Sequence, residues 1–222
     1  MNTKKKILST KKLSQTQKEL LNNFIVDEIE LIEISFNNSI RLQNPIKNAV
    51  FTSKNAIIGI FNQSSSDALQ FENVYCVGDK TAQFLEEKNV KVTIKAHSAE
   101  ELADAILLNK NIDEVYFFCG NLRRDELPEM LAENNVKVNE IEVYSTNFKP
   151  VKIKNIYDGI LFFSPSSVKS YLLKNTDTQS VAFCIGNTTA SEAIDDFENV
   201  FVADEPTVEN VIESVNQYFD YE

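Results

Sequence analysis

Two stretches decide the fold: VGDKTAQFLEEKNV at residues 77–90 and IGNTTASEAIDDFENV at residues 185–200. Each runs in the same order: an apolar residue, a glycine, two polar residues, Thr-Ala, a helix-like segment, and Asn-Val. An apolar strand, a polar turn and an amphipathic run together are typical of a strand-to-helix unit. The sequence therefore contains one such unit twice.

The repetition extends beyond this pair. FTSKNAI at 51–57 matches FFSPSSV at 162–168, and HSAEELADAI at 97–106 matches EPTVENVIESV at 205–215. More loosely, residues 7–35 match residues 117–145. Four segments repeated in one order, at a nearly constant spacing of about half the chain, predict two homologous halves.

Each half alternates short apolar runs with amphipathic segments. The runs at 74–77, 115–118, 160–163 and 181–185 are rich in β-branched and aromatic residues. Near-continuous apolar strands separated by helices predict a parallel sheet that is covered on both faces. The expected fold class is α/β with two similar lobes, and 222 residues suffice for two small cores.

Helix boundaries are indicated by capping residues. The expected starts are Ser14 with Gln17 and Ser98 with Glu101 as capping boxes, Ser164 with Pro165, and Thr207 after Pro206. The expected stops are Asn89, Asn134 or Asn135, and Asn199. Asparagine tolerates the left-handed conformation that ends a helix, so it can replace glycine, of which the chain has only five.

Composition and charge narrow the function classes. The net charge of −11 argues against binding to nucleic acid or to an anionic membrane. The three cysteines lie in apolar runs, and the single histidine, His97, offers no metal site or catalytic triad, so we expect no disulfide and no bound metal. The basic N-terminus lacks an apolar core of signal-peptide length, and no tract could span a bilayer. We expect a cytoplasmic protein.

Polar side chains gather at the expected strand-to-helix turns, where ligands bind in doubly wound α/β folds. The turns are 9–12, 52–55, 78–81, 120–124, 164–167 and 186–189. Cations at helix starts are locally unfavourable, by a few tenths to about 1 kcal/mol. Nevertheless, Lys11, Lys12, Lys54, Lys80, Arg123 and Arg124 lie there. An anionic ligand would remove this conflict. The alternative is that the hydroxyls only cap helices and the cations reach into water.

Several familiar signatures are absent. The sequence has no G-x-G-x-x-G, no G-x-x-x-x-G-K-[ST], no C-x-x-C and no G-x-S-x-G. Nucleotide-cofactor chemistry and serine hydrolysis are therefore unsupported, and we expect no cofactor.

The ordered set FTSKNAI, VGDKTA, Gly-x-x-Arg, EVYST, FFSPSSV and IGNTTA resembles the uroporphyrinogen-III synthase family over essentially the whole chain. The resemblance implies two α/β lobes joined by two extended crossover segments. Lobe 1 would comprise residues 1–36 and 150–222, lobe 2 residues 46–144, and the crossover linkers residues 37–45 and 145–149.

The resemblance also implies an activity: cyclisation of hydroxymethylbilane, a linear tetrapyrrole with eight carboxylates, with inversion of ring D and loss of water. Orientation of the substrate would be the main contribution of such an enzyme. Tyr144 matches the family's tyrosine at the crossing strand and would be the acid that protonates the leaving hydroxyl. Thr81 and Thr189 would each cap a helix and donate to a substrate carboxylate across one cleft. The other implied binding residues are Ser53, Lys54, Ser164, Ser166, Gly78, Gly186, Lys11 and Arg123.

The sequence departs from the family at two turns. The turn at 9–12 carries lysines where the family often has arginine, which keeps the charge but not the bidentate geometry. FFSPSS lacks the cation that Lys54 supplies to its twin. Two other functions stay open: a non-catalytic two-lobed binding protein for a small polyanionic ligand, and, less favoured by the polar turns, a tandem α/β interaction module. A monomer is expected.

Overall fold

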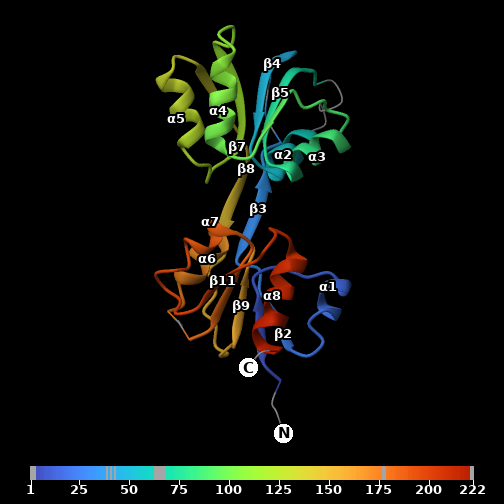
Figure 1. Cartoon of the computed structure of the whole chain (residues 1–222), viewed down its shortest axis with the longest axis vertical. Helices are drawn as coiled ribbons and strands as arrows, with labels where there is room; N and C mark the ends of the chain where they lie inside the picture. The colour runs from blue at the N-terminus through green and yellow to red at the C-terminus, as the bar shows by residue number, and fades with distance from the viewer. Residues whose placement is uncertain are drawn as a thin grey trace. The chain divides into compact units, whose positions relative to one another are not determined.

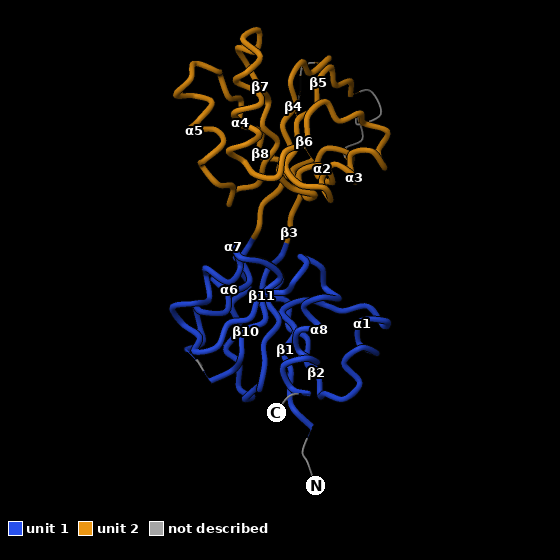
Figure 2. The backbone as a smooth tube through the Cα atoms, in the orientation of Figure 1, with its two compact units in different colours: residues 1–33, 147–222 blue, residues 34–146 orange. Residues whose placement is uncertain are grey.

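The computed structural model describes residues 4–38, 40, 42, 44–62, 69–176 and 179–220. The chain folds as two compact units, residues 1–33 with 147–222 (unit 1) and residues 34–146 (unit 2), which Figure 2 shows in two colours. It passes from unit 1 to unit 2 within strand β3 (Ile32–Phe36) and returns within strand β8 (Lys137–Phe148). The lobe limits stated above stay a prediction.

Unit 1 is built on a five-stranded sheet in the order β11-β10-β9-β1-β2. Each of its neighbouring pairs is parallel. The strands are β1 (Lys6–Ser9), β2 (Ile25–Glu28), β9 (Gly159–Phe162), β10 (Val181–Cys184) and β11 (Val200–Val202). The helices are α1 (Gln15–Glu19), α6 (Pro165–Leu172), α7 (Asn187–Ala190) and α8 (Val208–Asp220).

The apolar strands of unit 1 bury both faces. In β9, Ile160 and Phe162 pack in a cluster with residues of α6 and α7, while Leu161 packs in a second cluster with residues of α8. Successive side chains of a strand point to opposite faces. The continuous apolar runs of the sequence therefore supply two cores, one on each side of the sheet.

Unit 2 is built on a six-stranded sheet in the order β3-β8-β7-β4-β5-β6. The remaining strands are β4 (Ile46–Phe51), β5 (Phe71–Val77), β6 (Ile94–Ala96) and β7 (Glu114–Gly120). The helices are α2 (Lys54–Phe61), α3 (Asp79–Glu87), α4 (Ala99–Leu108) and α5 (Glu126–Glu133). Residues of α2 and α3 share one core cluster and those of α4 and α5 another, on opposite faces of the sheet (Figure 1).

The strand β3 gives unit 2 an antiparallel edge. The amide of Asn37 donates to the carbonyl of Val143, and the amide of Lys149 donates to the carbonyl of Leu31. Residue numbers therefore rise along β3 as they fall along β8, which is antiparallel pairing. The pairs β4–β5, β4–β7, β5–β6 and β7–β8 are parallel. The predicted fold class, parallel sheets flanked by helices in two similar lobes, is confirmed.

Most predicted helix boundaries are confirmed. Ser14 forms the full capping box with Gln17, Pro165 is in the first turn of α6, and the Thr207 hydroxyl accepts from the amide of Asn210 at 3.1 Å. Asn89 and Asn135 follow helix ends with φ of 59° and 63°.

Ser98 starts α4 as predicted, but its full capping box and the helix stop at Asn199 are wrong. Ser98 accepts from the amide of Glu101, but the Glu101 carboxylate accepts from the amide of His97 instead of Ser98, so the box is half made. Asn199 is not a helix stop, because α7 ends at Ala190 and the Asn199 carbonyl accepts from the amide of Ala182 in the neighbouring strand.

Candidate active site

Three turns of unit 2 meet at the carboxyl edge of its sheet. Phe51 pairs with Cys76 on one side and with Phe118 on the other. The residues two positions further on are Ser53, Gly78 and Gly120. Parallel strands end at the same edge, so the register brings these three turns side by side.

Ser53 caps α2. Its backbone is extended (φ −148°, ψ 147°), and its hydroxyl accepts from the amide of Ala56 at 3.2 Å. Lys54, the first residue of the helix, is exposed and places its ammonium 4.4 Å from the centre of the Phe84 ring. Among the described residues no carboxylate lies in ion-pair range of Lys54, so its charge remains available at the start of a helix.

Gly78 begins α3 and needs to be glycine. Its φ of 86° is a conformation that other residues rarely adopt. No side chain caps this helix, so the prediction that Thr81 is the cap is wrong: Thr81 is the third helical residue. The neighbouring Asp79 forms a 2.5 Å ion pair with Lys95, and this hydrogen bond lowers the pKa of Asp79. Asp79, the one acidic side chain of the turn, therefore stays charged, and Lys95 balances its charge.

Thr81 is only 7% exposed, yet its hydroxyl makes no hydrogen bond with any described residue. In the described part of the chain no side-chain oxygen is sealed from solvent without a partner. The Thr81 hydroxyl must therefore reach solvent through a small opening. An unpaired donor at the mouth of a turn is suited to a ligand oxygen.

Tyr144 lies on β8, half-buried, with its side chain directed towards Ser53. The Ser53 hydroxyl donates to the Tyr144 phenol oxygen at 3.2 Å. The phenol oxygen therefore accepts from the protein, and its own proton remains available for donation outward. This is the arrangement that a general acid requires.

Arg123 follows the third turn, but its side chain forms ion pairs away from Ser53. Its guanidinium pairs with Glu140 and Asp125, and these hydrogen bonds raise its pKa above the ordinary value. It lines a hollow of about 580 Å³ together with residues of α5 and the start of β8. The structure does not bring Arg123 together with Ser53 and Tyr144.

Unit 1 repeats this edge in part. Phe162 pairs with Cys184, so the turns at Ser164 and Gly186 adjoin. Ser164 caps α6 and accepts from the amide of Ser167 at 3.2 Å, while Ser166 is half-buried in the first turn. The predicted serines thus lie at a helix start, as their twin Ser53 does.

The second threonine of the repeat also does not cap its helix. Thr189 is the third residue of α7 and is 1% exposed, and no side chain caps that helix. Its hydroxyl, like that of Thr81, has no partner among the described residues. Gly186 differs from Gly78, because its φ of 179° is extended backbone that any residue adopts.

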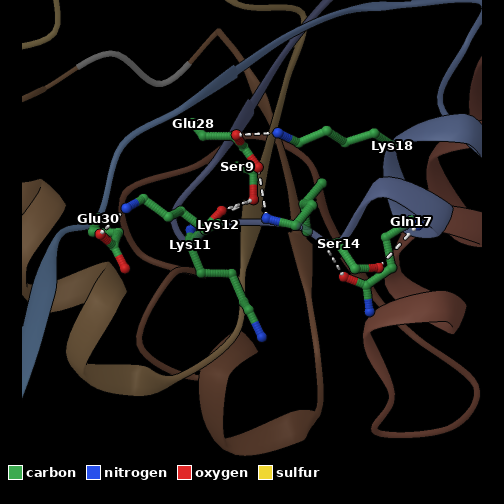
Figure 3. Close-up of polar contacts among 9 residues, drawn as sticks. Ser9, Lys11, Lys12, Ser14, Gln17, Lys18, Glu28 and Glu30 are labelled. Carbon is green, nitrogen blue, oxygen red and sulfur yellow. Dashed lines mark hydrogen bonds and ion pairs between the residues drawn. The ribbon is translucent and has the colours of Figure 1, made fainter.

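The β1–α1 turn of unit 1 is held by its own contacts (Figure 3). Glu28 accepts from the amide of Leu13 at 2.6 Å and pairs with Lys18 at 2.6 Å. Lys12 pairs with Glu30, whereas Lys11 extends away from these contacts and lies 5.3 Å from the centre of the Phe163 ring. Among the described carboxylates none pairs with Lys11.

The cysteines take no part in this chemistry. All three are buried free thiols. Burial raises the pKa of Cys76 and Cys119 to about 11 and that of Cys184 to about 12, so each stays a protonated thiol at neutral pH. Among the described residues no group of three or more His, Cys, Asp or Glu is placed to hold a metal ion.

The sequence reasoning missed the part played by Gly120. A Cβ built on Gly120 would lie less than 3.0 Å from three carbons of the Tyr144 ring. The available signal was the scarcity of glycine. With only five in the chain, each glycine marks a candidate position where a side chain would not fit. Separately, no helix in the described ranges has the length and apolar character needed to cross a bilayer.

The fold and these turns define a two-unit α/β protein whose half-repeats each present Ser, Thr and Gly at a carboxyl sheet edge. The family model described as uroporphyrinogen-III synthase HemD matches residues 18–213. The chain therefore belongs to the uroporphyrinogen-III synthase family.

Individual relatives agree with this assignment. The chain is 29% identical over 186 residues to the porphyrin biosynthesis protein HemD of Ruminiclostridium josui, covering 75% of this chain and 37% of that protein. It is 34% identical over 101 residues to the uroporphyrinogen-III synthase of Saccharomyces cerevisiae, covering 41% of this chain and 37% of that protein. These matches span just over a third of each relative's length.

The fold has solved counterparts. The crystal structure of uroporphyrinogen-III synthetase from Helicobacter pylori 26695 matches with a TM-score of 0.69 at 19% identity. The match covers 96% of this chain and 99% of that chain, so both units and their order along the sequence are shared.

Proposed function

We propose that the protein is a uroporphyrinogen-III synthase, which converts hydroxymethylbilane to uroporphyrinogen III with inversion of ring D and loss of water. The observation that carries the proposal is the Tyr144 phenol, which accepts from Ser53 and keeps its own proton for donation. Family membership across residues 18–213 supports the reaction class.

The acid step assigns one proton to one atom. The Tyr144 phenol donates its proton to the hydroxyl of the substrate's hydroxymethyl group, the carbon–oxygen bond breaks, and water leaves. The electron-rich pyrrole next to that carbon supplies the electrons. On ring closure a proton is released from the macrocycle, and solvent returns a proton to the tyrosine oxygen, so the enzyme is unchanged.

The remaining proposed residues hold the carboxylates of the substrate. The starts of α2, α3 and α6 carry the positive ends of helix dipoles, which favour anions. Lys54 and Lys11 add charge that no described carboxylate neutralises, and Thr81 and Thr189 add unpaired hydroxyls. We propose Ser53, Ser164, Ser166, Gly78, Gly186 and Arg123 as further binding residues; Arg123 would first have to give up an ion pair.

The proposed enzyme acts as a cytoplasmic monomer without a cofactor and does not bind nucleic acid. Three buried free thiols are typical of proteins from reducing compartments. The net charge of −11 opposes binding to nucleic acid. Light scattering on the eluted protein would test the monomer, and a mass near twice 25.2 kDa would refute it.

The decisive experiment is the conversion of hydroxymethylbilane by the purified protein, with separation of the product isomers. The synthase predicts mainly the type III isomer, whereas the free substrate closes unaided to type I. Type I product alone would overturn the proposal. If uroporphyrinogen III also raised the melting temperature in that case, the protein would instead be a non-catalytic binder of polyanions.

A further inference from the structure

We propose that Gly120 is a positioning residue for Tyr144. Because Gly120 has no side chain, the phenol ring of Tyr144 can lie over it and reach Ser53. The catalytic part of this inference rests on the proposed function. The structural part stands on the contacts of unit 2 alone.

The strand order explains why the ring needs this space. Tyr144 is on β8, Gly120 is its partner on β7, and Ser53 follows β4, the next strand along. Adjacent strands are about 4.8 Å apart, so the Tyr144 side chain must cross β7 to reach Ser53. A Cβ at Gly120 would lie less than 3.0 Å from Cζ, Cε1 and Cε2 of the ring, a separation that real Cβ atoms essentially never show.

The backbone of Gly120 does not itself demand glycine. Among the described residues the only glycine with positive φ is Gly78. Alanine could therefore adopt the Gly120 conformation, and in the described structure the Tyr144 ring supplies the three nearest atoms that its methyl group would meet. The ring, not the turn, accounts for glycine at this position.

A β-bulge directs the ring to this place. Cys119 pairs with Glu142 but Gly120 pairs with Tyr144, so Val143 is an extra residue on β8. Adjacent residues of a regular strand point to opposite faces, whereas Val143 and Tyr144 pack in the same apolar cluster. Bulges are known to redirect side chains at functional edges.

The half-repeat in unit 1 lacks this arrangement. The alignment of residues 7–35 with residues 117–145 pairs Thr10 with Gly120. Thr10 is buried, and its hydroxyl donates to the carbonyl of Leu161 at 2.7 Å, on the neighbouring strand of unit 1. Where no ring crosses the strand, the position carries a side chain.

A stability cycle tests the contact without any assay of activity. Thermal unfolding is measured for wild type, Gly120→Ala, Tyr144→Ala and the double variant. We expect Gly120→Ala to lower the melting temperature in the wild-type background and to change it little when Tyr144 is alanine. The same loss in both backgrounds would overturn the proposal; a single variant too unstable to purify, restored by the second substitution, would support it.

Kinetics test the catalytic part. We expect Gly120→Ala to lower kcat for type III product by up to about 100-fold with little change in KM, and to add little further loss in a Tyr144→Phe background. Gly159→Ala is the matched control, because its Cβ would meet the Phe183 ring at 2.8 Å in unit 1, and it should keep kcat per folded molecule. Wild-type kcat in Gly120→Ala would refute the positioning role.

The two proposals fail separately. If wild type makes no type III product, the proposed function falls, while the stability cycle still reports on the ring and Gly120. If wild type is active and Gly120→Ala is equally active, only the inference about Gly120 falls.

Discussion

The hydroxyl of Ser53 donates to the phenol oxygen of Tyr144 at 3.2 Å, across one intervening strand of the sheet. Ser53 also accepts from the amide of Ala56, so one side chain both fixes the start of α2 and orients the phenol. The start of a helix and the candidate proton donor are thereby coupled through a single oxygen atom.

Replacement of Tyr144 by phenylalanine removes the proton and keeps the ring. We expect kcat for type III product to fall about 100-fold or more, the usual contribution of a general acid, with a nearly unchanged melting temperature. Tyr116→Phe on the neighbouring strand is the control, because the same oxygen atom is removed within the same apolar cluster. Full activity of Tyr144→Phe would remove this residue from the mechanism.

Substitution of Ser53 separates its two roles. Ser53→Ala loses both the cap and the bond to the phenol, so we expect a loss of about 1 kcal/mol in unfolding free energy and a lower kcat. Ser53→Thr retains a hydroxyl and should restore both. Ser98→Ala, which removes the cap of α4, should cost similar stability without a change in kcat; an equal loss of kcat there would contradict the role of Ser53.

The unpaired threonine hydroxyls predict an effect on binding without an effect on folding. Thr81→Val and Thr189→Val keep the side-chain shape and break no described hydrogen bond, so we expect little change in melting temperature and a raised KM. Thr10→Val is the contrast, since the Thr10 hydroxyl donates to the carbonyl of Leu161 at 2.7 Å while 3% exposed. It should destabilise by about 1 kcal/mol. Calorimetry measures the melting temperatures and steady-state kinetics the KM values. An unchanged KM in Thr81→Val and Thr189→Val would contradict a binding role for these hydroxyls.

The charge of Lys54 predicts salt-dependent binding. Lys54→Gln should raise KM, and the difference from wild type should shrink as salt is added, because exposed charges are screened. Lys88→Gln is a matched control, since Lys88 lies over the same Phe84 ring at 5.6 Å but near the other end of α3. Equal effects of the two variants would assign the change to net charge instead of to the site.

Glu28 predicts a pH dependence of stability. Burial raises its pKa, but hydrogen bonds from Lys18 and from the amide of Leu13, with the nearby charges of Lys18 and Lys12, outweigh burial and leave the pKa below the ordinary value. A depressed carboxylate pKa stabilises the fold above the unfolded-state pKa, and this stability is lost as pH falls through the folded-state pKa. Glu28→Gln should therefore cost about 1 kcal/mol at pH 7 and progressively less in acid.

Chemical unfolding at pH 7 and at progressively lower pH measures this difference. Glu30→Gln removes the exposed pair with Lys12 and should change stability little at any pH. A cost for Glu28→Gln that stayed constant into acid would show that the charge of Glu28 is not the source of its contribution.

Much of the fold could be read from the sequence because strand period and helix caps are local signals. The runs around Ile160 and Cys76 are apolar at every position. Such runs predict strands that are buried on both faces of a sheet. The prediction for Asn199 is wrong because the sequence shows only its local preference for the left-handed conformation. It does not show that the Asn199 carbonyl accepts from the amide of Ala182 in the neighbouring strand.

The site was less predictable because its key relations cross strands. That Arg123 pairs with Glu140, and that the Tyr144 ring lies over Gly120, depend on strand order and on a one-residue bulge. Neither is encoded in the spacing of motifs. Thr81 is a residue type that caps helices, but the N-cap of α3 is Gly78, so the helix starts three positions earlier than a cap at Thr81 requires.

The passage of the chain through β3 and β8 sets an order of synthesis and folding. Residues 34–146 are contiguous, so unit 2 can complete its sheet as soon as β8 leaves the ribosome. In unit 1, β1 lies between β2 and β9, and β9 begins only at Gly159. The edge of β1 that pairs with β9 must therefore stay open while the whole of unit 2 is translated, and an unpaired strand edge is prone to aggregation.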